Sequence, residues 1–415
     1  MTLLADLLST VFERRVRSDA AARLGDRSLE ELAGDLIGSS GEMSGLALAR
    51  AMLDRYAALD DAEKLAFFHF LAGALGVDQA AVGAALEALG EGQTKASYRA
   101  FMAASEPPRQ ELIRRLNQVP GATGALVQMR ADLLRLGRGD EALMALDLDF
   151  RHLFASWFNR GFLVLRPISW ETSAQVLEKI TAYEAVHAIH SWADLRRRLE
   201  PTDRRCFAFF HPAMPSEPLI FVEVALTQGI PGSVQALLAE GRPALPEAEA
   251  DTAVFYSISN CQAGLAGISF GNSLIKQVAS DLSAEVPGLS TFVTLSPIPG
   301  LASWMVEQEL EPGDDTRLRQ LAAYYLTRAK GRGNAPRDPV ARFHLGNGAQ
   351  VHMLHAEADT SEKGHAQSHG VMVNYLYDLS RVTQNHERFA ESGEIAASAE
   401  VRALAQAADK TLTQE

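Results

Sequence analysis

The sequence changes character once, between about residues 150 and 162, and this change limits the folds open to the chain. Before it, apolar residues such as Phe68, Leu71 and Leu75 recur at helical spacing, and runs of β-branched residues are scarce. Asp60 and the acidic residues after it are typical of a helix start. Amphipathic helices bury their apolar faces against one another. We therefore predict an all-helical bundle for residues 1–155.

Beyond this boundary, short apolar runs alternate with helical stretches. Strands are expected at Phe162–Leu165, Cys206–His211, Leu219–Leu226, Ala253–Ser259, Thr291–Leu295 and Gln350–Ala356. Helices are expected at Thr172–Val186, Ser191–Leu199, Gly232–Glu240, Asn272–Ala284, Thr316–Ala329 and Gln367–Leu379. Such alternation predicts an α/β domain with a partly parallel sheet over residues 156–415. The fold class is thus α+β in two domains, as a length of 415 residues also suggests.

The net charge of the chain limits the kinds of molecule that it could bind. The formal net charge is −13 and no basic stripe is concentrated anywhere, which argues against nucleic-acid and anionic-membrane binding. No apolar run is long enough to span a bilayer. An anionic ligand must therefore be held locally. The two cysteines, Cys206 and Cys261, are too few for a disulfide scaffold and fit a reducing cytoplasm, and the N-terminus does not resemble a secretory signal.

A glycine-rich loop follows the expected strand Ala253–Ser259 and precedes an expected helix. Backbone N–H groups and a helix N-terminus in this order can hold a phosphate, although a tight turn without a ligand has the same pattern. The spacing matches neither a Walker A loop nor a Rossmann fingerprint. Gly267–Gly271 also fits G-x-S-x-G. However, Ser269 comes about ten residues after the strand, and a hydrolase nucleophile follows its strand directly.

Ser296 and His344 are the other candidates for chemistry. Ser296 ends a strand and is followed by Pro297 and Pro299, which stiffen the turn, so it could face a crevice or simply close the turn. His344 is expected in the last turn of a short helix that begins at Asp338, where the helix dipole favours the imidazolium form. A capping histidine would have the same pattern.

Four further histidines raise the question of a metal site, and we expect none. No HExxH motif is present, and two of the four would point to opposite faces of a strand. These histidines are His352, His355, His365 and His369.

Five segments in a fixed order resemble malonyl-CoA decarboxylase: 255–259, 264–276, 295–300, 343–349 and 370–375. Segments 157–163 and 217–227 resemble this family as well. The resemblance implies a helical domain used in oligomerisation, as a dimer or tetramer, and a catalytic domain related to the N-acetyltransferase (GNAT-like) fold. It also implies a carboxy-lyase that converts malonyl-CoA to acetyl-CoA and CO₂ without a metal or an organic cofactor.

By the same resemblance, His344 matches the catalytic histidine, as proton donor, and Ser296 the catalytic serine, as its hydrogen-bonding or proton-accepting partner. Ser257 and Tyr377 are weaker candidates for the lining of the site. The loop expected to hold the CoA pyrophosphate comprises Ala266, Gly267, Ile268, Ser269, Phe270, Gly271 and Asn272. Ala266 and Ser269 depart from the usual acetyltransferase pattern, so backbone amides and the helix dipole would have to hold the phosphates.

Two alternatives stay open at the sequence level. One is a CoA-dependent N-acyltransferase on the same fold, which would acylate an added amine. The other is a non-enzymatic helical assembly protein whose α/β part only binds CoA. Incubation with malonyl-CoA separates them, because only the decarboxylase releases CO₂.

Overall fold

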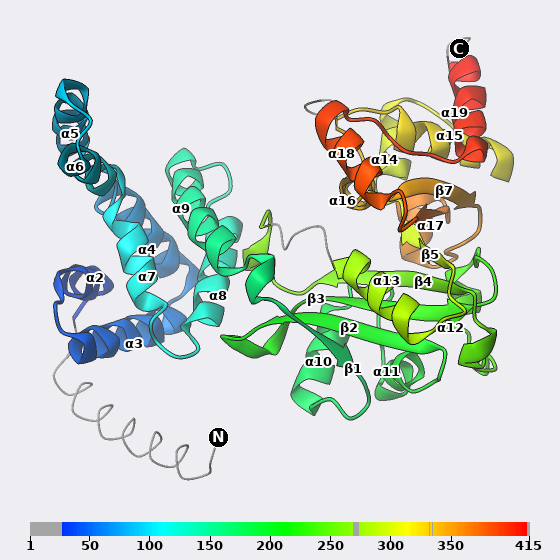
Figure 1. Cartoon of the computed structure of the whole chain (residues 1–415), viewed down its shortest axis with the longest axis horizontal. Helices are drawn as coiled ribbons and strands as arrows, with labels where there is room; N and C mark the ends of the chain where they lie inside the picture. The colour runs from blue at the N-terminus through cyan, green and yellow to red at the C-terminus, as the bar shows by residue number, and fades with distance from the viewer. Residues whose placement is uncertain (1–26, 269–273, 332, 334, 413–415) are drawn as a thin grey trace. The chain divides into compact units, whose positions relative to one another are not determined.

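The computed structural model describes residues 27–268, 274–331, 333 and 335–412 (Figure 1). The described residues separate into two compact units. A helical unit contains residues 27–163, 211–217 and 262–268, and a mixed unit contains residues 164–210, 218–261 and 274–412. The segment 211–217 and the glycine-rich loop therefore belong to the helical unit, although in the sequence they lie between segments of the mixed unit.

The helices of the helical unit begin and end at residues that favour helix termini. Asp60 forms a capping box with Glu63, and Pro108 is the first residue of its helix. The helices are α2 (Leu29–Gly38), α3 (Glu42–Ala58), α4 (Asp61–Gly73), α5 (Gln79–Glu91), α6 (Lys95–Ser105), α7 (Pro108–Leu116), α8 (Ala122–Leu136) and α9 (Glu141–Trp157). Helices α5 and α6 pack on each other and contain no buried residue, so their apolar side chains stay partly exposed.

The mixed unit contains a sheet with strand order β1-β2-β3-β4-β5-β8-β6, and β7 pairs with the other side of β8. Strands β4 and β5 form a parallel pair, and α13 (Leu274–Glu285) lies between them in the sequence. The strands are β1 (Val164–Ile168), β2 (Arg204–His211), β3 (Met214–Thr227), β4 (Thr252–Asn260), β5 (Thr291–Thr294), β6 (Ser296–Pro297), β7 (Gln350–His355) and β8 (Met372–Leu376).

Helices cover this sheet. Helices α10 (Ala174–Tyr183) and α11 (Trp192–Leu199) lie on one face, where Ile180 and Leu195 pack against Phe210 and Phe221 (Figure 1). The remaining helices are α12 (Val234–Leu238), α14 (Leu301–Glu307), α15 (Asp315–Thr327), α16 (Pro339–Gly346), α17 (Glu362–Ser368), α18 (Val382–Ser392) and α19 (Ala399–Leu412). The predicted fold class, helices followed by a mixed α/β unit, is therefore confirmed.

One predicted element is wrong. The helix expected at Gln367–Leu379 is the end of α17 followed by strand β8. Its residues Met372–Tyr375 are all buried, and β8 lies inside the sheet, between β5–β6 and β7. A short, mostly apolar run cannot be assigned to helix or strand by periodicity. Among the described helices, none is long and apolar enough to cross a membrane.

Candidate active site

Ser296 lies where the chain leaves one strand neighbour for another. β5 pairs with β4 as far as Thr294, and Ser296 then pairs with Val373 of β8 as part of β6. The Ser296 side chain is buried, and its Oγ donates a hydrogen bond to Thr294 Oγ1 at 2.8 Å. The predicted position of Ser296, directly after a strand and before a stiff turn, is thus observed.

His344 reaches Ser296 from α16. This helix begins at the Asp338 cap, whose carboxylate accepts a hydrogen bond from the Ala341 amide, and His344 occupies its last turn. His344 Nε2 lies 3.2 Å from Ser296 Oγ, and Nδ1 lies 2.8 Å from the Tyr377 hydroxyl. Both catalytic candidates and one lining candidate, Tyr377, therefore meet in one hydrogen-bonded chain.

The direction of the hydrogen bonds assigns the tautomer of His344. Ser296 uses its proton on Thr294, so its oxygen accepts from His344 Nε2–H. Nδ1 is then the acceptor for the Tyr377 hydroxyl. The chain runs from Tyr377 through His344 and Ser296 to Thr294, with each group donating to the next.

Burial decides the charge of His344. The imidazole is enclosed and stacks on the Tyr375 ring with centroids 4.5 Å apart, and loss of solvent lowers its pKa to about 3. The expectation that the helix dipole favours the imidazolium form is therefore wrong. A dipole contributes at most about 2 kcal/mol, roughly 1.5 pK units, whereas complete burial can shift a pKa by 3–5 units. His344 is neutral at pH 7.

Strand β8 holds the Thr294 end of this hydrogen-bonded chain in place. The Tyr375 amide donates to Thr294 Oγ1 at 3.1 Å, and Asn374 Nδ2 donates to the Thr294 carbonyl at 2.7 Å. His355 Nε2 lies 2.5 Å from Asn374 Oδ1, so this histidine belongs to the supporting network. Within the described ranges, no group of three or more His, Cys, Asp or Glu side chains could hold a metal ion.

The strands β4 and β5 separate beside Ser296. Their pairing ends at Phe255 and Thr294, with a last bond from the Leu295 amide to the Phe255 carbonyl at 3.0 Å. β4 continues along β3 to Asn260, and a bulge leaves Tyr256 without a register partner in β3. Beyond Phe255, no described strand pairs with the β5-facing edge of β4. Such an edge offers amide and carbonyl groups to an extended ligand.

The glycine-rich loop is anchored on α8 within the helical unit. Arg130, buried and paired with Asp147, donates to the Gly264 carbonyl at 2.7 Å. Gly264 approaches α8 so closely that an added Cβ would lie 1.8 Å from the Val127 carbonyl oxygen. Only glycine fits at this contact.

Three of the seven residues predicted to hold phosphate are described. The amides of Ala266 and Ile268 donate to the carbonyls of Ala263 and Leu265, so these two N–H groups already have partners within the loop. Gly267 has a φ of 72°, and a Cβ built on it would lie 3.7 Å from a guanidinium nitrogen of Arg151. Ser269, Phe270, Gly271 and Asn272 lie outside the described residues.

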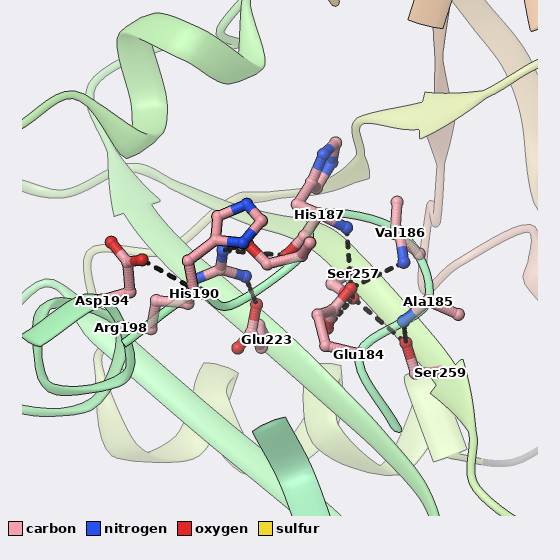
Figure 2. Close-up of polar contacts among 11 residues, drawn as sticks. Glu184, Ala185, Val186, His187, His190, Asp194, Arg198, Glu223, Ser257 and Ser259 are labelled. Carbon is pink, nitrogen blue, oxygen red and sulfur yellow. Dashed lines mark hydrogen bonds and ion pairs between the residues drawn. The ribbon is translucent and has the colours of Figure 1, made fainter. Parts of the chain in front are cut away.

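Ser257 does not join the chain around His344. Its Oγ donates to the Glu184 carboxylate at 2.7 Å, and Ser259 Oγ accepts from the Ala185 amide at 3.2 Å (Figure 2). Ser257 and Ser259 thus fasten the loop between α10 and α11 to β4. Sequence analysis assigned no role to Thr294, Asn374 or the loop 184–187, although Thr294 lies two residues before Ser296 and Asn374 lies in the segment 370–375 that resembles the family.

Two family models match the chain. The malonyl-CoA decarboxylase N-terminal domain matches residues 75–158, and the malonyl-CoA decarboxylase C-terminal domain matches residues 161–318 and 314–415.

The chain belongs to the malonyl-CoA decarboxylase family.

Relatives and solved structures agree with this membership. The chain is 35% identical to mitochondrial malonyl-CoA decarboxylase from Anser anser anser over 355 residues, which cover 71% of this chain and 69% of the relative. It is 48% identical to a crystal structure of malonyl-CoA decarboxylase from Rhodopseudomonas palustris, with a TM-score of 0.86, covering 90% of this chain and 98% of that one. The enzyme structure from Cupriavidus metallidurans matches at 37% identity and a TM-score of 0.73, over 91% and 98% of the two chains.

Because the chain belongs to the malonyl-CoA decarboxylase family, the geometry around Ser296 and His344 can be compared with what a decarboxylation requires. The Ser296–His344 pair is buried and hydrogen-bonded, and it lies at the separation of β4 and β5. A neutral imidazole with an N–H directed along a polar chain can deliver a proton without carrying a permanent charge.

Proposed function

We propose that this member of the malonyl-CoA decarboxylase family converts malonyl-CoA to acetyl-CoA and CO₂. The observation that carries the proposal is the ordered chain Tyr377–His344–Ser296, buried and neutral, at the point where β4 and β5 part. The β4 edge beyond Phe255, with which no described strand pairs, supports it, because the acyl thioester arm of CoA is an extended chain with amide groups.

The reaction makes a specific demand on such a site. The bond between C2 and the carboxylate breaks, CO₂ leaves, and the electron pair passes to an enolate whose charge lies mainly on the thioester oxygen. One proton must then reach C2. The thioester is itself the electron acceptor, so we propose that neither a metal nor an organic cofactor takes part.

His344 is proposed as the proton donor. Transfer of its Nε2 proton to C2, with the Tyr377 hydroxyl proton moving to Nδ1, leaves the imidazole neutral throughout. When the product leaves, a proton from solvent reaches Nε2 and the Nδ1 proton returns to Tyr377, which restores the starting tautomer and the Tyr377 hydroxyl. General acid catalysis of this kind typically contributes roughly 10²–10⁴-fold to a rate.

Ser296 is proposed as the hydrogen-bonding and proton-accepting partner. Its oxygen accepts from His344 in the free enzyme, and its hydroxyl can turn to the malonyl carboxylate once substrate displaces that contact. This orients the carboxylate out of the thioester plane, where the breaking bond overlaps the carbonyl π system. No acyl-serine intermediate is required.

For the CoA end of the substrate, we propose the loop Ala266–Asn272 as the pyrophosphate site. The guanidinium of Arg151 beside Gly267 supports this, because it supplies positive charge that the loop sequence lacks. Within the described residues, Arg151 makes no hydrogen bond or ion pair, so its charge is available to a phosphate.

We also propose residues 1–155 as an oligomerisation domain and residues 156–415 as the catalytic domain, working as a homodimer or homotetramer in the cytoplasm. The hairpin of α5 and α6 supports assembly, because Leu86, Tyr98 and Met102 on it are each about half exposed. The free, buried thiols of Cys206 and Cys261 suit a reducing compartment.

The activity is tested by incubating the purified full-length protein with malonyl-CoA. The proposal expects stoichiometric CO₂ and acetyl-CoA, measured by trapped CO₂ and by chromatography. Acetylation of an added amine would instead support the N-acyltransferase alternative, and binding of CoA without turnover would support a CoA-binding assembly protein. Either result would overturn the proposal.

The roles of the two residues are tested by His344→Asn and Ser296→Ala. Each variant is expected to lose roughly 10²–10⁴-fold in kcat while its melting temperature stays within a few degrees of the parent. Ser303→Ala is the matched control, because Ser303 is exposed on α14 and only caps a turn through the Gly300 carbonyl. Folded variants that keep full turnover would contradict the assignment.

A further inference from the structure

A cavity of about 260 Å³ lies within the mixed unit, and arginine side chains from three segments line it. Two of them belong to α11, one begins β2 and one lies in the loop after α12: Arg197, Arg198, Arg204 and Arg242. Planar guanidinium groups match the oxygen atoms of carboxylates and phosphates better than any other side chain. Four of them around one cavity, in a chain with a net charge of −13, concentrate positive charge there.

The cavity lies at the end of the sheet where β4 begins. Asp203 lines it, and the Asp203 carbonyl accepts a hydrogen bond from the Leu226 amide at 2.9 Å. Leu226 pairs with Ala253, the second residue of β4. The glycine-rich loop follows the opposite end of β4, and a strand of this length spans roughly 25 Å. Neither Ser296 nor His344 lines the cavity, so it is separate from the candidate active site.

A single carboxylate serves two of these guanidinium groups. Asp203 pairs with Arg242 through Oδ2 and lies 3.4 Å from Arg204 Nη1 through Oδ1. Asp203 and Arg204 are both buried. Apart from this pair, and within the described residues, Arg204 donates only to the main-chain carbonyls of Asp203 and Leu237. A buried cation that shares its counter-ion with a second cation is incompletely neutralised.

The two buried arginines of the cavity differ in how well their charge is balanced. Burial opposes the charge of Arg198, but its partner Glu223, at 3.0 Å, raises the pKa of Arg198 overall (Figure 2). Burial lowers the pKa of Arg204, and the charge of Arg242 lowers it further, by more than Asp203 restores. Arg204 is thus the guanidinium whose charge lacks a full partner.

The other charges at the cavity do not cancel this excess. Four guanidinium groups and two carboxylates, those of Asp194 and Asp203, line it, which gives a formal charge of +2. Two further carboxylates pair with lining arginines from outside the cavity. Burial raises the pKa of Glu223 to about 7, so it is only partly ionised at neutral pH. The Glu240 side chain is 80% exposed, where a pair with Arg197 contributes little. The lining therefore keeps a positive charge.

We propose that this cavity binds a small doubly charged oxyanion, inorganic phosphate or a short dicarboxylate, held by Arg204 and Arg242. Both guanidinium groups reach one carboxylate, so they are close enough to share the oxygens of one ligand. Pockets for drug-sized molecules measure roughly 300–1,000 Å³, so this smaller cavity suits a ligand of a few atoms. The site does not depend on the proposed decarboxylation. A ligand that binds only the folded chain also stabilises it.

Calorimetric titration of the full-length protein with inorganic phosphate, at an ionic strength held constant with chloride, tests the site. We expect saturable binding with a Kd of about 0.01–1 mM and a melting temperature that rises with phosphate concentration. Arg242→Gln and Arg204→Gln should each weaken binding roughly tenfold or more, because each removes one guanidinium group from the oxyanion. Arg196→Gln is the matched control. Arg196 lies exposed on α11, pairs with Glu200 and does not line the cavity, so this variant should bind phosphate as the parent does.

Two further arms identify the ligand and its place. Succinate is titrated alone and against phosphate: the tighter anion names the class of ligand, and mutual displacement shows that both use one cavity. Arg151→Gln should bind as the parent does, because Arg151 lies beside the glycine-rich loop. Arg242 is only partly buried, so its variant decides the question if Arg204→Gln does not fold. Binding lost in Arg151→Gln but kept in Arg242→Gln would overturn the proposal, as would no binding of either anion up to about 10 mM.

Discussion

At the scale of single residues, the site is governed by what burial does to polar groups. His344, Ser296 and Tyr377 are all enclosed, and each hydroxyl or imidazole proton in the chain is directed to a neighbour. An enclosed, fully satisfied chain defines a single arrangement of protons, whereas the same groups in water would adopt many. Enclosure also keeps the imidazole neutral, which is the state that the proposed proton transfer needs.

Tyr377→Phe and Tyr375→Phe form a matched pair. The Tyr377 hydroxyl donates to His344 Nδ1, whereas the Tyr375 hydroxyl is buried without a partner among the described residues. Tyr377→Phe should lower kcat roughly 10–100-fold and stability by about 1–3 kcal/mol, because His344 loses its donor. Tyr375→Phe should be neutral or slightly stabilising and keep most of the activity. Equal effects in kcat assays and urea melts would refute the proposed proton path.

Stability should also depend on pH through His344. Its pKa is about 3 in the folded chain and near 6.5 when exposed, so between these values the unfolded chain binds more protons. Stability therefore falls as pH drops from 6.5 toward 3, by up to about 1.4 kcal/mol per pH unit from this group. Urea unfolding at pH 7 and pH 5.5 should show a smaller loss for His344→Gln than for the parent. Identical pH slopes would mean that His344 is not enclosed.

At the scale of elements, the candidate phosphate loop depends on a close backbone contact within the helical unit. Its first part packs on α8 at Gly264 and is held by Arg130. A loop that must present backbone N–H groups needs such an anchor, because an unanchored loop would lose its geometry through conformational entropy. The sheet positions Ser296, because β8 holds Thr294 through hydrogen bonds and Ser296 lies two residues further along the chain.

Gly264→Ala tests the anchor. The added Cβ would overlap the Val127 carbonyl, so the loop must move away from α8. We expect a loss of at least about 1–3 kcal/mol in unfolding free energy and a KM for malonyl-CoA raised several-fold with a smaller change in kcat. Gly83→Ala on α5 meets nothing within 4 Å and should instead stabilise by roughly 0.5–1 kcal/mol. A Gly264→Ala enzyme with parental KM would show that the anchor does not serve substrate binding.

At the scale of the whole molecule, the helical unit exposes apolar side chains on the hairpin α5–α6. The hairpin α5–α6 buries none of its residues and leaves apolar side chains in contact with water. This exposure is energetically unfavourable for an isolated chain. Self-association through this hairpin would cover it. Because the chain carries a net charge of −13, such an interface must rely on apolar contact to overcome repulsion between copies.

Leu86→Glu combined with Met102→Glu should shift the protein toward monomers. Both side chains lie on the hairpin and are more than half exposed, so the change should not disturb the folded unit. Light scattering coupled to size-exclusion chromatography would measure the shift. Val306→Glu, on α14 of the mixed unit and 77% exposed, is the control and should leave the mass unchanged. An unchanged mass for the double variant would exclude the hairpin as the assembly surface.

The sequence by itself determined the helices of the first unit, the approximate place of the change to α/β structure, and the local settings of Ser296 and His344. These features depend on local rules: capping residues, helical periodicity and prolines act within a few positions. The strand β8 could not be predicted, because Met372–Leu376 is short and apolar except for Asn374, and only its neighbours on both sides make it a strand.

Only the tertiary structure decided the charge of His344 and the role of Ser257. Burial lowers the pKa of His344 more than a helix dipole can raise it, and burial is a property of the packed fold. Ser257 binds Glu184 because segments some 70 residues apart meet there. Such contacts depend on which surfaces pack together, and no local pattern in the chain encodes them.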